Sequence, residues 1–461
     1  MFKKIEIWVL YLTLVVVFIS YIIFGWLIIR EHEKGDYIPV ISSFSKASYF
    51  LATIPRNIKM MIINSNPLKV REDDFIRFQA RGDRFKGISG FSGETNEEEI
   101  YYLLSRYNGD IKQSITELID LRTFKVLHTW NPDINTIFQK IVIEKDGLWS
   151  SLMKDRNDFR FRLTHPIFEE DGSLIFHHSS PLIKIDKNSN LEWMRSDVQY
   201  HHSNERDKDG NYWHCVRYFP FEVDSRYVGE DFNKYMDHGI RKLSSSGEIL
   251  FDKSISNIFL ENDLGHLLFS VGDKGFNKDP IHLNDIQPVE KDTKYWKKGD
   301  VFLSLRHQSM ILLYRPKTNK IIWKTDKKLF HQHDVDIIND NKISIFNNNS
   351  KDFINGDRVD GNNQVVIYDF KTKEYSYYLN ESLKKKDVRT ITHGRSQILP
   401  NGDLIVEESN YGRTLYFNYD GSQKWEHINR ASDGNVYKVS WSRVLYKEED
   451  IKKVHMFLKK E

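Results

Sequence analysis

Histidines gather at a few polar, turn-like positions of this chain. Seventeen histidines occur among its 461 residues, and five segments set them beside amide or guanidinium side chains. These segments are YHHSNERDKDGN with His201 and His202, DPIHLNDIQP with His282 and Asn284, SLRHQS with Arg306 and His307, FHQHDVDI with His331 and His333, and THGRSQILPNGD with His393 and Arg395. Neutral imidazoles bind metal ions, move protons and act as nucleophiles. The five segments are therefore the chain's candidates for chemistry.

Two kinds of chemistry fit such a set. A metal site needs three or four convergent imidazoles or carboxylates, and His331 and His333 would point to the same side of a strand. Alternatively, one neutral imidazole attacks an electrophile while a guanidinium such as Arg306 stabilises the charge that develops. An arginine among the histidines repels a metal dication and suits an anion, so we predict an anion site without metal. Each histidine taken alone can also be an ordinary structural residue.

Short strand-like runs must position these segments. From about residue 87 onward, such runs alternate with Asp-Gly, Asn-Gly and Ser-Gly turns, and long helical periodicity is scarce. A turn, two strands and a closing strand with a tryptophan recur three times, over residues 171–194, 299–324 and 401–427, ending at Trp193, Trp323 and Trp425. Weaker copies cover residues 115–130, 239–252 and 362–379. This repetition predicts an all-β, six-bladed β-propeller in which the tryptophans fill gaps between blades.

A propeller would bring the five histidine segments together. Residues 87–446 divided among six blades give about 60 residues per blade, more than compact blades contain, so insertions are expected. Corresponding positions of successive blades converge on one axial channel. Each histidine segment lies just before or within a different proposed blade. A β-sandwich is the competing architecture, but it does not account for the repeated tryptophan endings.

Composition and the N-terminus narrow the function classes. The balance of 67 Lys+Arg against 65 Asp+Glu gives a net charge of +2, so nucleic acid is not expected as a partner. Cys215 is the only cysteine, which excludes an intramolecular disulfide. Residues 7–29 carry no charge and are long enough to span a bilayer. With Lys3 and Lys4 before them, they predict an uncleaved signal anchor and a domain on the periplasmic or another extracytoplasmic side.

The expected organisation has four parts. Residues 1–34 form the cytoplasmic N-terminus and transmembrane signal anchor. Residues 35–86 form a stalk or linker, in which Ser43 to Met61 could be one amphipathic helix. Residues 87–446 form the propeller, and residues 447–461 form a charged C-terminal tail.

The ordered motifs resemble a known family. HH…DGN, HxN, GD…SLRHQ, QHD and SQILPNGDLIVEESNYGR follow one another as in the arylsulfotransferases, the PAPS-independent aryl-sulfate sulfotransferases, over roughly residues 95–446. The resemblance implies a six-bladed propeller with its active site at the channel. It also implies transfer of a sulfuryl group from a phenolic sulfate ester to another phenol, through a sulfo-histidine and with ping-pong kinetics. The implied partners are an aryl sulfate donor and a phenolic acceptor, and no cofactor is implied.

The resemblance also assigns roles to residues. His333 corresponds to the nucleophile, Arg306 to the oxyanion-binding arginine, and His282 with Asn284 to the HxN pair. His202, or less directly His201, corresponds to the upstream histidine, which would protonate the leaving phenolate and deprotonate the acceptor. His307 and His393 are further substrate-binding candidates. The chain departs from the family pattern at Phe346-Asn347-Asn348-Asn349, where Phe-Asp-Asn-Gly is usual, and in having an anchor and a single cysteine instead of a cleaved signal and a disulfide.

Two other functions remain open at this point. A propeller of this kind could be a non-catalytic binding or assembly module at the membrane surface. It could also be a metal-dependent hydrolase or a quinoprotein-like enzyme. The sequence has no Gly-rich phosphate loop and no dinucleotide fingerprint.

Overall fold

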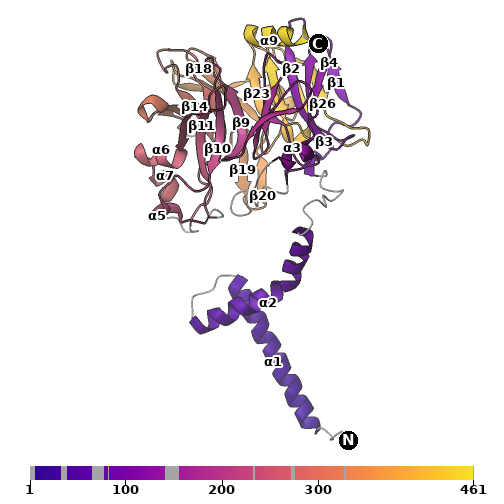
Figure 1. Ribbon diagram of the computed structural model, residues 1–461, viewed down its shortest axis with the longest axis vertical. Coiled ribbons are helices and arrows are strands. Elements are labelled where there is room, and N and C mark those ends of the chain that lie inside the picture. Colours follow the sequence, from indigo (N-terminus) through magenta and orange to yellow (C-terminus); the bar gives the residue numbers. More distant parts are fainter. Residues whose placement is uncertain are drawn as a thin grey trace. The chain divides into compact units, whose positions relative to one another are not determined.

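A computed structural model describes residues 6–32, 39–64, 77–80, 82–140, 155–231, 234–270, 276–326 and 329–459. The chain divides into two compact units, Met1–Arg71 and Glu72–Glu461, and both are drawn in Figure 1. Within the predicted stalk, the described residues are 39–64 and those from 77 onward, except residue 81. Lys3 and Lys4 lie outside the described residues.

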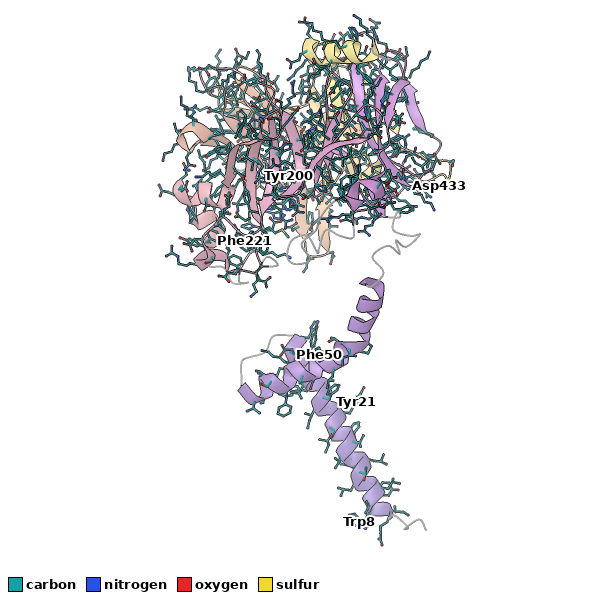
Figure 2. The ribbon with its side chains drawn as sticks, viewed as in Figure 1. Trp8, Tyr21, Phe50, Tyr200, Phe221 and Asp433 are labelled. Atoms are coloured by element: carbon teal, nitrogen blue, oxygen red, sulfur yellow. The ribbon has the colours of Figure 1, made fainter. Side chains whose placement is uncertain are left out.

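The N-terminal unit contains two helices. Helix α1 (Ile7–His32) has no buried residue and is long and apolar enough to cross a membrane. Helix α2 (Pro39–Asn64) includes the predicted amphipathic segment and contacts α1. Trp8, Tyr21 and Phe50 project from these helices in Figure 2.

The second unit is a six-bladed propeller, as predicted. Each blade is an antiparallel sheet of four strands or more, and the strands run in the following order from the innermost outward. Blade 1 holds β27 (Arg443–Leu445), β2 (Tyr101–Asn108), β3 (Gln113–Asp120) and β4 (Lys125–Trp130); blade 2 holds β5 (Thr164–Phe168), β6 (Leu174–His177), β7 (Leu182–Ile185) and β8 (Leu191–Arg195); blade 3 holds β9 (Gln199–Arg206), β10 (Tyr212–Tyr218), β11 (Asp237–Leu243) and β12 (Ile249–Ser254). Blade 4 holds β13 (Leu283–Pro288), β14 (Val301–Leu305), β15 (Met310–Arg315) and β16 (Lys320–Lys324); blade 5 holds β17 (Val335–Asn339), β18 (Lys342–Asn347), β21 (Gln364–Asp369) and β22 (Glu374–Tyr378); blade 6 holds β23 (Arg395–Ile398), β24 (Leu404–Glu408), β25 (Arg413–Phe417), β26 (Gln423–Ile428) and β1 (Gly90–Gly93).

The two ends of the propeller segment close the ring in two places. Strand β27, from the C-terminal side, pairs with β2 and completes blade 1 from the inside. Strand β1, from the N-terminal side, pairs with β26 and extends blade 6 on the outside. Figure 1 shows β1, β2, β4 and β26 next to the C-terminus. Both ends of the propeller segment are thus held by strand pairing, which removes the exposed edge that a loose terminal strand would leave.

The repeats visible in the sequence are the three outer strands of a blade. Residues 171–194, 299–324 and 401–427 cover β6–β8, β14–β16 and β24–β26. The innermost strand precedes each repeat, and four of the five histidine segments fall there. The exception is SLRHQS, which forms the turn between β14 and β15 of blade 4. DPIHLNDIQP enters the same blade, so the expectation that each segment belongs to a different blade is wrong. The surplus length per blade lies in insertions such as the hairpin of β19 (Ser350–Phe353) and β20 (Gly356–Val359). Short helices are the other insertions: α3 (Ile134–Gln139), α5 (Ser225–Val228), α6 (Ile255–Glu261), α7 (His266–Phe269), α8 (Asn380–Lys385), η3 (Pro316–Thr318) and η4 (Ser409–Tyr411).

The repeated tryptophans fill the gaps between blades, as expected. Trp425 on β26 is fully buried against Tyr102 of blade 1, and its indole N–H donates to Asn96 Oδ1 at 2.8 Å. Trp323 on β16 packs on Tyr368 of blade 5, with ring centroids 4.8 Å apart. Trp193 on β8 joins the core shared with blade 3. These three tryptophans thus pack the fourth strands of blades 6, 4 and 2 against the next blade.

The segment expected as a charged tail contains a packed helix. Helix α9 (Glu448–Leu458) buries Val454 and Phe457, and the Phe457 ring lies 6.0 Å from that of Trp130. Its acidic residues occupy the first turn, where they stabilise the helix dipole. The hydrophobic positions at i and i+3 explain why this charged segment is helical.

Replacing Trp425 by alanine is expected to lower the free energy of unfolding by about 3–5 kcal/mol, because it opens a cavity and leaves the Asn96 amide oxygen without its donor. Trp323→Ala, at a half-buried position, should cost clearly less. Denaturant unfolding of the full-length protein, followed by circular dichroism, measures both. Equal losses of unfolding free energy in the two variants would contradict the larger contribution assigned to Trp425.

Candidate active site

A repeated backbone feature builds one end of the channel. At or just before the innermost strand of every blade, one non-glycine residue adopts a left-handed conformation, with φ between 47° and 60°. These six residues are His165, His202, His282, His331, His393 and Trp441. The left-handed region costs an ordinary residue of the order of 1–3 kcal/mol. Such a conformation, repeated in all six blades and filled five times by histidine, marks this end as the candidate site.

His202 lies at the centre of the cluster. Its strand, β9, is marked by Tyr200 in Figure 2. The His202 ring centroid lies 5.3 Å from that of His282, 5.8 Å from His393 and 6.2 Å from His333. The Trp441 ring borders both His202 and His333 at 6.2 Å. Residues from distant parts of the sequence therefore meet here.

The hydrogen bonds of His333 fix its tautomer. Nδ1 lies 2.7 Å from Asn348 Oδ1 and 3.1 Å from the His331 carbonyl oxygen, so it must carry the proton. Nε2 then has the lone pair, and it accepts from the His393 backbone N–H at 2.9 Å. Burial, followed by the charge of Arg306, holds the pKa of His333 well below its ordinary value. His333 is therefore a neutral imidazole with its basic nitrogen facing the cluster.

Arg306 is a guanidinium that lacks an ion-pair partner among the described residues. It lies in the turn between β14 and β15, with its backbone N–H bonded to the His282 carbonyl at 2.9 Å. One terminal nitrogen donates to His307 Nε2 at 2.6 Å, while Nε is buried and has no hydrogen-bond acceptor in the described part of the chain. Burial lowers the pKa of Arg306. A desolvated guanidinium with spare donors is suited to bind an oxyanion.

A carboxylate and four histidines form a second set of contacts. Asp279 Oδ1 lies 3.0 Å from His238 Nε2, and Oδ2 lies 2.6 Å from His282 Nδ1. His238 Nδ1 lies 3.2 Å from His201 Nε2, and His201 Nδ1 lies 2.8 Å from His202 Nδ1. Burial would raise the pKa of Asp279, but the charges and hydrogen bonds of His238 and His282 hold it well below its usual range.

His238, Asp279 and His282 offer ligand atoms within 4.8 Å of one another, a spacing that a metal ion could bridge. Both Asp279 oxygens are already engaged by imidazole nitrogens, and His238 is also bonded on its other side to His201. The hydrogen bonds account for the grouping.

The sequence-predicted residues are all gathered at this end of the channel, in differing positions. His202, His282, His307 and His393 keep part of their surface exposed, whereas His333 and Arg306 lie deeper. Asn284 is fully buried and donates to the Gln332 carbonyl at 2.9 Å, so it holds the loop that carries His333. His201 is buried behind His202. Asn284 and His201, expected to bind substrate, are placed to position other groups.

Other residues of the site do not emerge from the sequence motifs. Asn348 belongs to the segment that departs from the family pattern. Asp279 opens the DPIHLN motif three residues before His282, a spacing that could have revealed it. His238 and Trp441 carry no local signal. Arg162, whose Nε donates to His178 Nδ1 at 3.3 Å, is a second guanidinium whose charge reaches the cluster at His393.

The buried residues just beyond the histidines are strongly charged. Arg395 lies 3.7 Å from Asp334 and Arg443 lies 3.0 Å from Glu205. Burial raises the pKa of Asp334 to about 6. Asp334 therefore belongs to this ionic layer and not to the group around His333.

A cavity of about 330 Å³ lies further along the same strands, lined by Glu205, Gln287, Asp336, Gln397 and helix α9 residues among others. None of its lining residues is a histidine.

Comparisons with solved structures find chains at about 10% identity. A Bacteroides caccae protein of unknown function shares 10% identity over 74% of this chain and 98% of its own, with a TM-score of 0.45. A streptogramin B lyase shares 10% over 77% and 96%, with a TM-score of 0.36. A virginiamycin B lyase from Staphylococcus aureus shares 9% over 59% and 72%, with a TM-score of 0.32. At these TM-scores, the likenesses carry no argument about activity.

No curated protein matches the chain. The family model described as Arylsulfotransferase (ASST) matches residues 167–430. This match covers more than half of the chain and includes all eight predicted site residues, from His201 to His393. The chain belongs to the arylsulfotransferase family.

Proposed function

We propose that this protein moves a sulfuryl group from an aryl sulfate ester to a phenolic acceptor through a sulfo-histidine at His333. One observation carries the proposal: Asn348 fixes the proton of His333 on Nδ1, and the Nε2 lone pair faces a cluster whose guanidinium, Arg306, has no ion-pair partner in the described part of the chain. Sulfuryl transfer, like phosphoryl transfer, depends mainly on positioning and charge stabilisation. No metal is needed, since a phenolate is already a good leaving group.

In the first half-reaction, His333 Nε2 attacks sulfur in line with the ester oxygen. The S–N bond forms, the S–O bond breaks, and its electron pair leaves on the phenolate oxygen. Arg306 and His282 hold the equatorial oxygens. The His393 backbone N–H points at Nε2 before the reaction, so once sulfur occupies Nε2 this N–H can donate to a sulfuryl oxygen.

His202 serves as the proton carrier of both half-reactions. In the first, the protonated form of His202 gives its Nε2 proton to the leaving phenolate, which leaves the neutral imidazole. In the second, it takes the proton of the acceptor phenol while the phenol oxygen attacks sulfur and the S–N electron pair returns to His333. His202 Nδ1 is held by His201, whereas Nε2 has no bond to any described residue, so Nε2 is the atom that meets the phenol.

Arg306 has a second effect on His333. Its charge, after burial, keeps the pKa of His333 low, so the imidazole stays unprotonated and nucleophilic across the physiological range. The arginine that stabilises the transferred group thus also maintains the nucleophile. The charge of Arg306 is neutralised only when the sulfate ester binds, and by then His333 is already unprotonated.

Incubation of the full-length protein with 4-nitrophenyl sulfate is expected to add one sulfuryl group to the intact mass, and a phenol should discharge it. His333→Ala should abolish the adduct. His331→Asn is the control, because asparagine tolerates the left-handed backbone at this position, and it should keep the adduct. An unmodified wild-type mass, without release of nitrophenol, would reject the proposal and favour a propeller that only binds.

We also propose that α1 is an uncleaved anchor that leaves the propeller on the extracytoplasmic, periplasmic side. The support is its charge-free length and the two lysines that precede it. Protease added to intact spheroplasts should digest the propeller, with its N-terminal anchor still present by mass. Protection until lysis would place the domain in the cytoplasm instead.

A further inference from the structure

We propose that Asp279, His238 and His201 form a proton relay for His202, so that the proton removed from the acceptor is stored away from the reacting sulfur. This inference rests on the proposed function and adds three residues to it. It follows from consecutive contacts that lead from the carboxylate to the centre of the site.

The hydrogen bonds determine where each proton lies. The Asp279 carboxylate accepts from His238 Nε2, so neutral His238 must accept at Nδ1. His201 Nε2 is then the donor to His238, and His201 Nδ1 accepts from His202 Nδ1. His202 Nε2 is left with its lone pair. Every bond in the line has one donor and one acceptor, and the free basic nitrogen is the one that faces His333 and His393.

A proton added at one end can move its charge to the other. When His202 Nε2 takes the phenol proton, its Nδ1 proton passes to His201 Nδ1, and the His201 Nε2 proton passes to His238 Nδ1. His238 becomes the imidazolium and rests against the Asp279 carboxylate, while His201 and His202 are neutral again. The reverse sequence returns the proton to the phenolate of the next donor. No proton is gained or lost over a full cycle.

The electrostatics of the site make this displacement useful. Burial, followed by the charges of neighbouring histidines, holds the pKa values of His201 and His202 well below the ordinary value. A cation at His202 would face His282, His333 and His393. A cation at His201 would face Arg217 and His282. Burial lowers the pKa of His238 to about 4 against the opposing effect of Asp279, the only carboxylate among the described residues that is bonded to the line. The position next to Asp279 is therefore where a positive charge is best tolerated.

His238→Gln gives a sharp test. Glutamine can donate to Asp279 and accept from His201, which keeps the tautomers, but it cannot take a proton. The rate at which the sulfo-enzyme transfers its group to phenol should fall about 100-fold, the scale of acid–base catalysis. Formation of the His333 adduct from 4-nitrophenyl sulfate, whose leaving group needs no proton, should change by less than about 3-fold. His427→Gln, at a buried histidine of blade 6, is the matched control and should change neither step.

The pH dependence provides a second readout. Transfer to phenol needs the relay in its neutral form, so its rate falls as the pH drops through the pKa of the relay. In His238→Gln the charge cannot reach Asp279, the relay becomes a weaker base, and this acid limb should move to lower pH. A purely structural role would lower the rate without moving the limb.

Three outcomes would overturn the relay. Wild-type rates in His238→Gln, with loss only in His238→Ala, would reduce His238 to a positioning residue. Equal loss in both half-reactions would show general damage to the site. A stoichiometric transition metal in the purified protein, lost in Asp279→Asn, would make the group a metal site. Failure of the proposed function itself differs from these, because the wild-type protein would then form no adduct.

A second inference concerns helix α2 and rests on separate observations. Helix α2 contacts α1, and its buried residues are three serines, Ser42, Ser45 and Ser48, among the side chains that the structure describes. Its outer side carries Val40, Phe44, Phe50 and Leu51, each at least 55% exposed. This arrangement reverses the polarity expected of a helix pair in water, where apolar residues face the partner.

We infer that the outer face of α2 is covered by the lipid of a bilayer interface. The surface is continuous with α1, the helix that could cross a membrane. The rings of His32, at the end of α1, and Tyr49 of α2 lie 6.4 Å apart, so α2 lies where the apolar helix ends. Small residues between helices and large apolar residues toward lipid are the pattern of membrane-embedded pairs.

Spin labels at single cysteines test this in the full-length protein, since the native Cys215 is fully buried. In phosphatidylcholine–phosphatidylglycerol vesicles, labels at Phe44→Cys and Leu51→Cys should be reached by oxygen and shielded from a water-soluble nickel chelate. Ser45→Cys, facing α1, is the control and should be shielded from both. Labels at residues 44 and 51 that the nickel chelate reaches would place the outer face in water and reject the inference.

Discussion

The closed ring of six blades is the constraint on which the site depends. A ring of six separate sheets fixes where each innermost strand lies, and a left-handed residue lies in or just before each of these strands. The ring can hold six strained residues because strand pairing closes it at both ends, β27 with β2 and β1 with β26. Because the same kink recurs in every blade, five histidines and a tryptophan converge without any of them being neighbours in the sequence.

Burial then decides the chemistry of those histidines. A solvated imidazole would be partly protonated near neutral pH. In this cluster burial lowers the pKa of His202, His333 and His393, which favours the neutral imidazole that the proposed function requires. The two opposite charges of the site lie on either side of one imidazole: Arg306 donates to His307 Nε2, and His307 Nδ1 lies 3.6 Å from Asp279 Oδ2. The proposed anion site and the proposed proton relay are therefore adjacent.

The sequence was sufficient for the architecture and for part of the site. The tryptophan-ended repeats predict the blades because strand alternation and turn residues are local signals, and the family motifs locate His202, His282, Arg306 and His333. The neighbouring residues that hold these four side chains in place could not be predicted from the sequence. His238 lies in no motif. Asn348 matches the family's Phe-Asp-Asn-Gly pattern, in which no role was assigned to it, and the departures are its neighbours Asn347 and Asn349. The sequence suggests substrate contacts for Asn284 and His201, whereas the structure buries both side chains. Helix α9 was not recognised in the sequence either, because charged residues dominate its composition.

The stereochemical course at sulfur tests the central claim most directly. A donor ester made chiral with three oxygen isotopes would be used with the full-length protein and a phenol acceptor, and the configuration of the product ester determined. Two in-line displacements, onto His333 and then onto the phenol, predict overall retention. Inversion would mean a single direct transfer between the two phenols, with no sulfo-histidine, and would contradict the account.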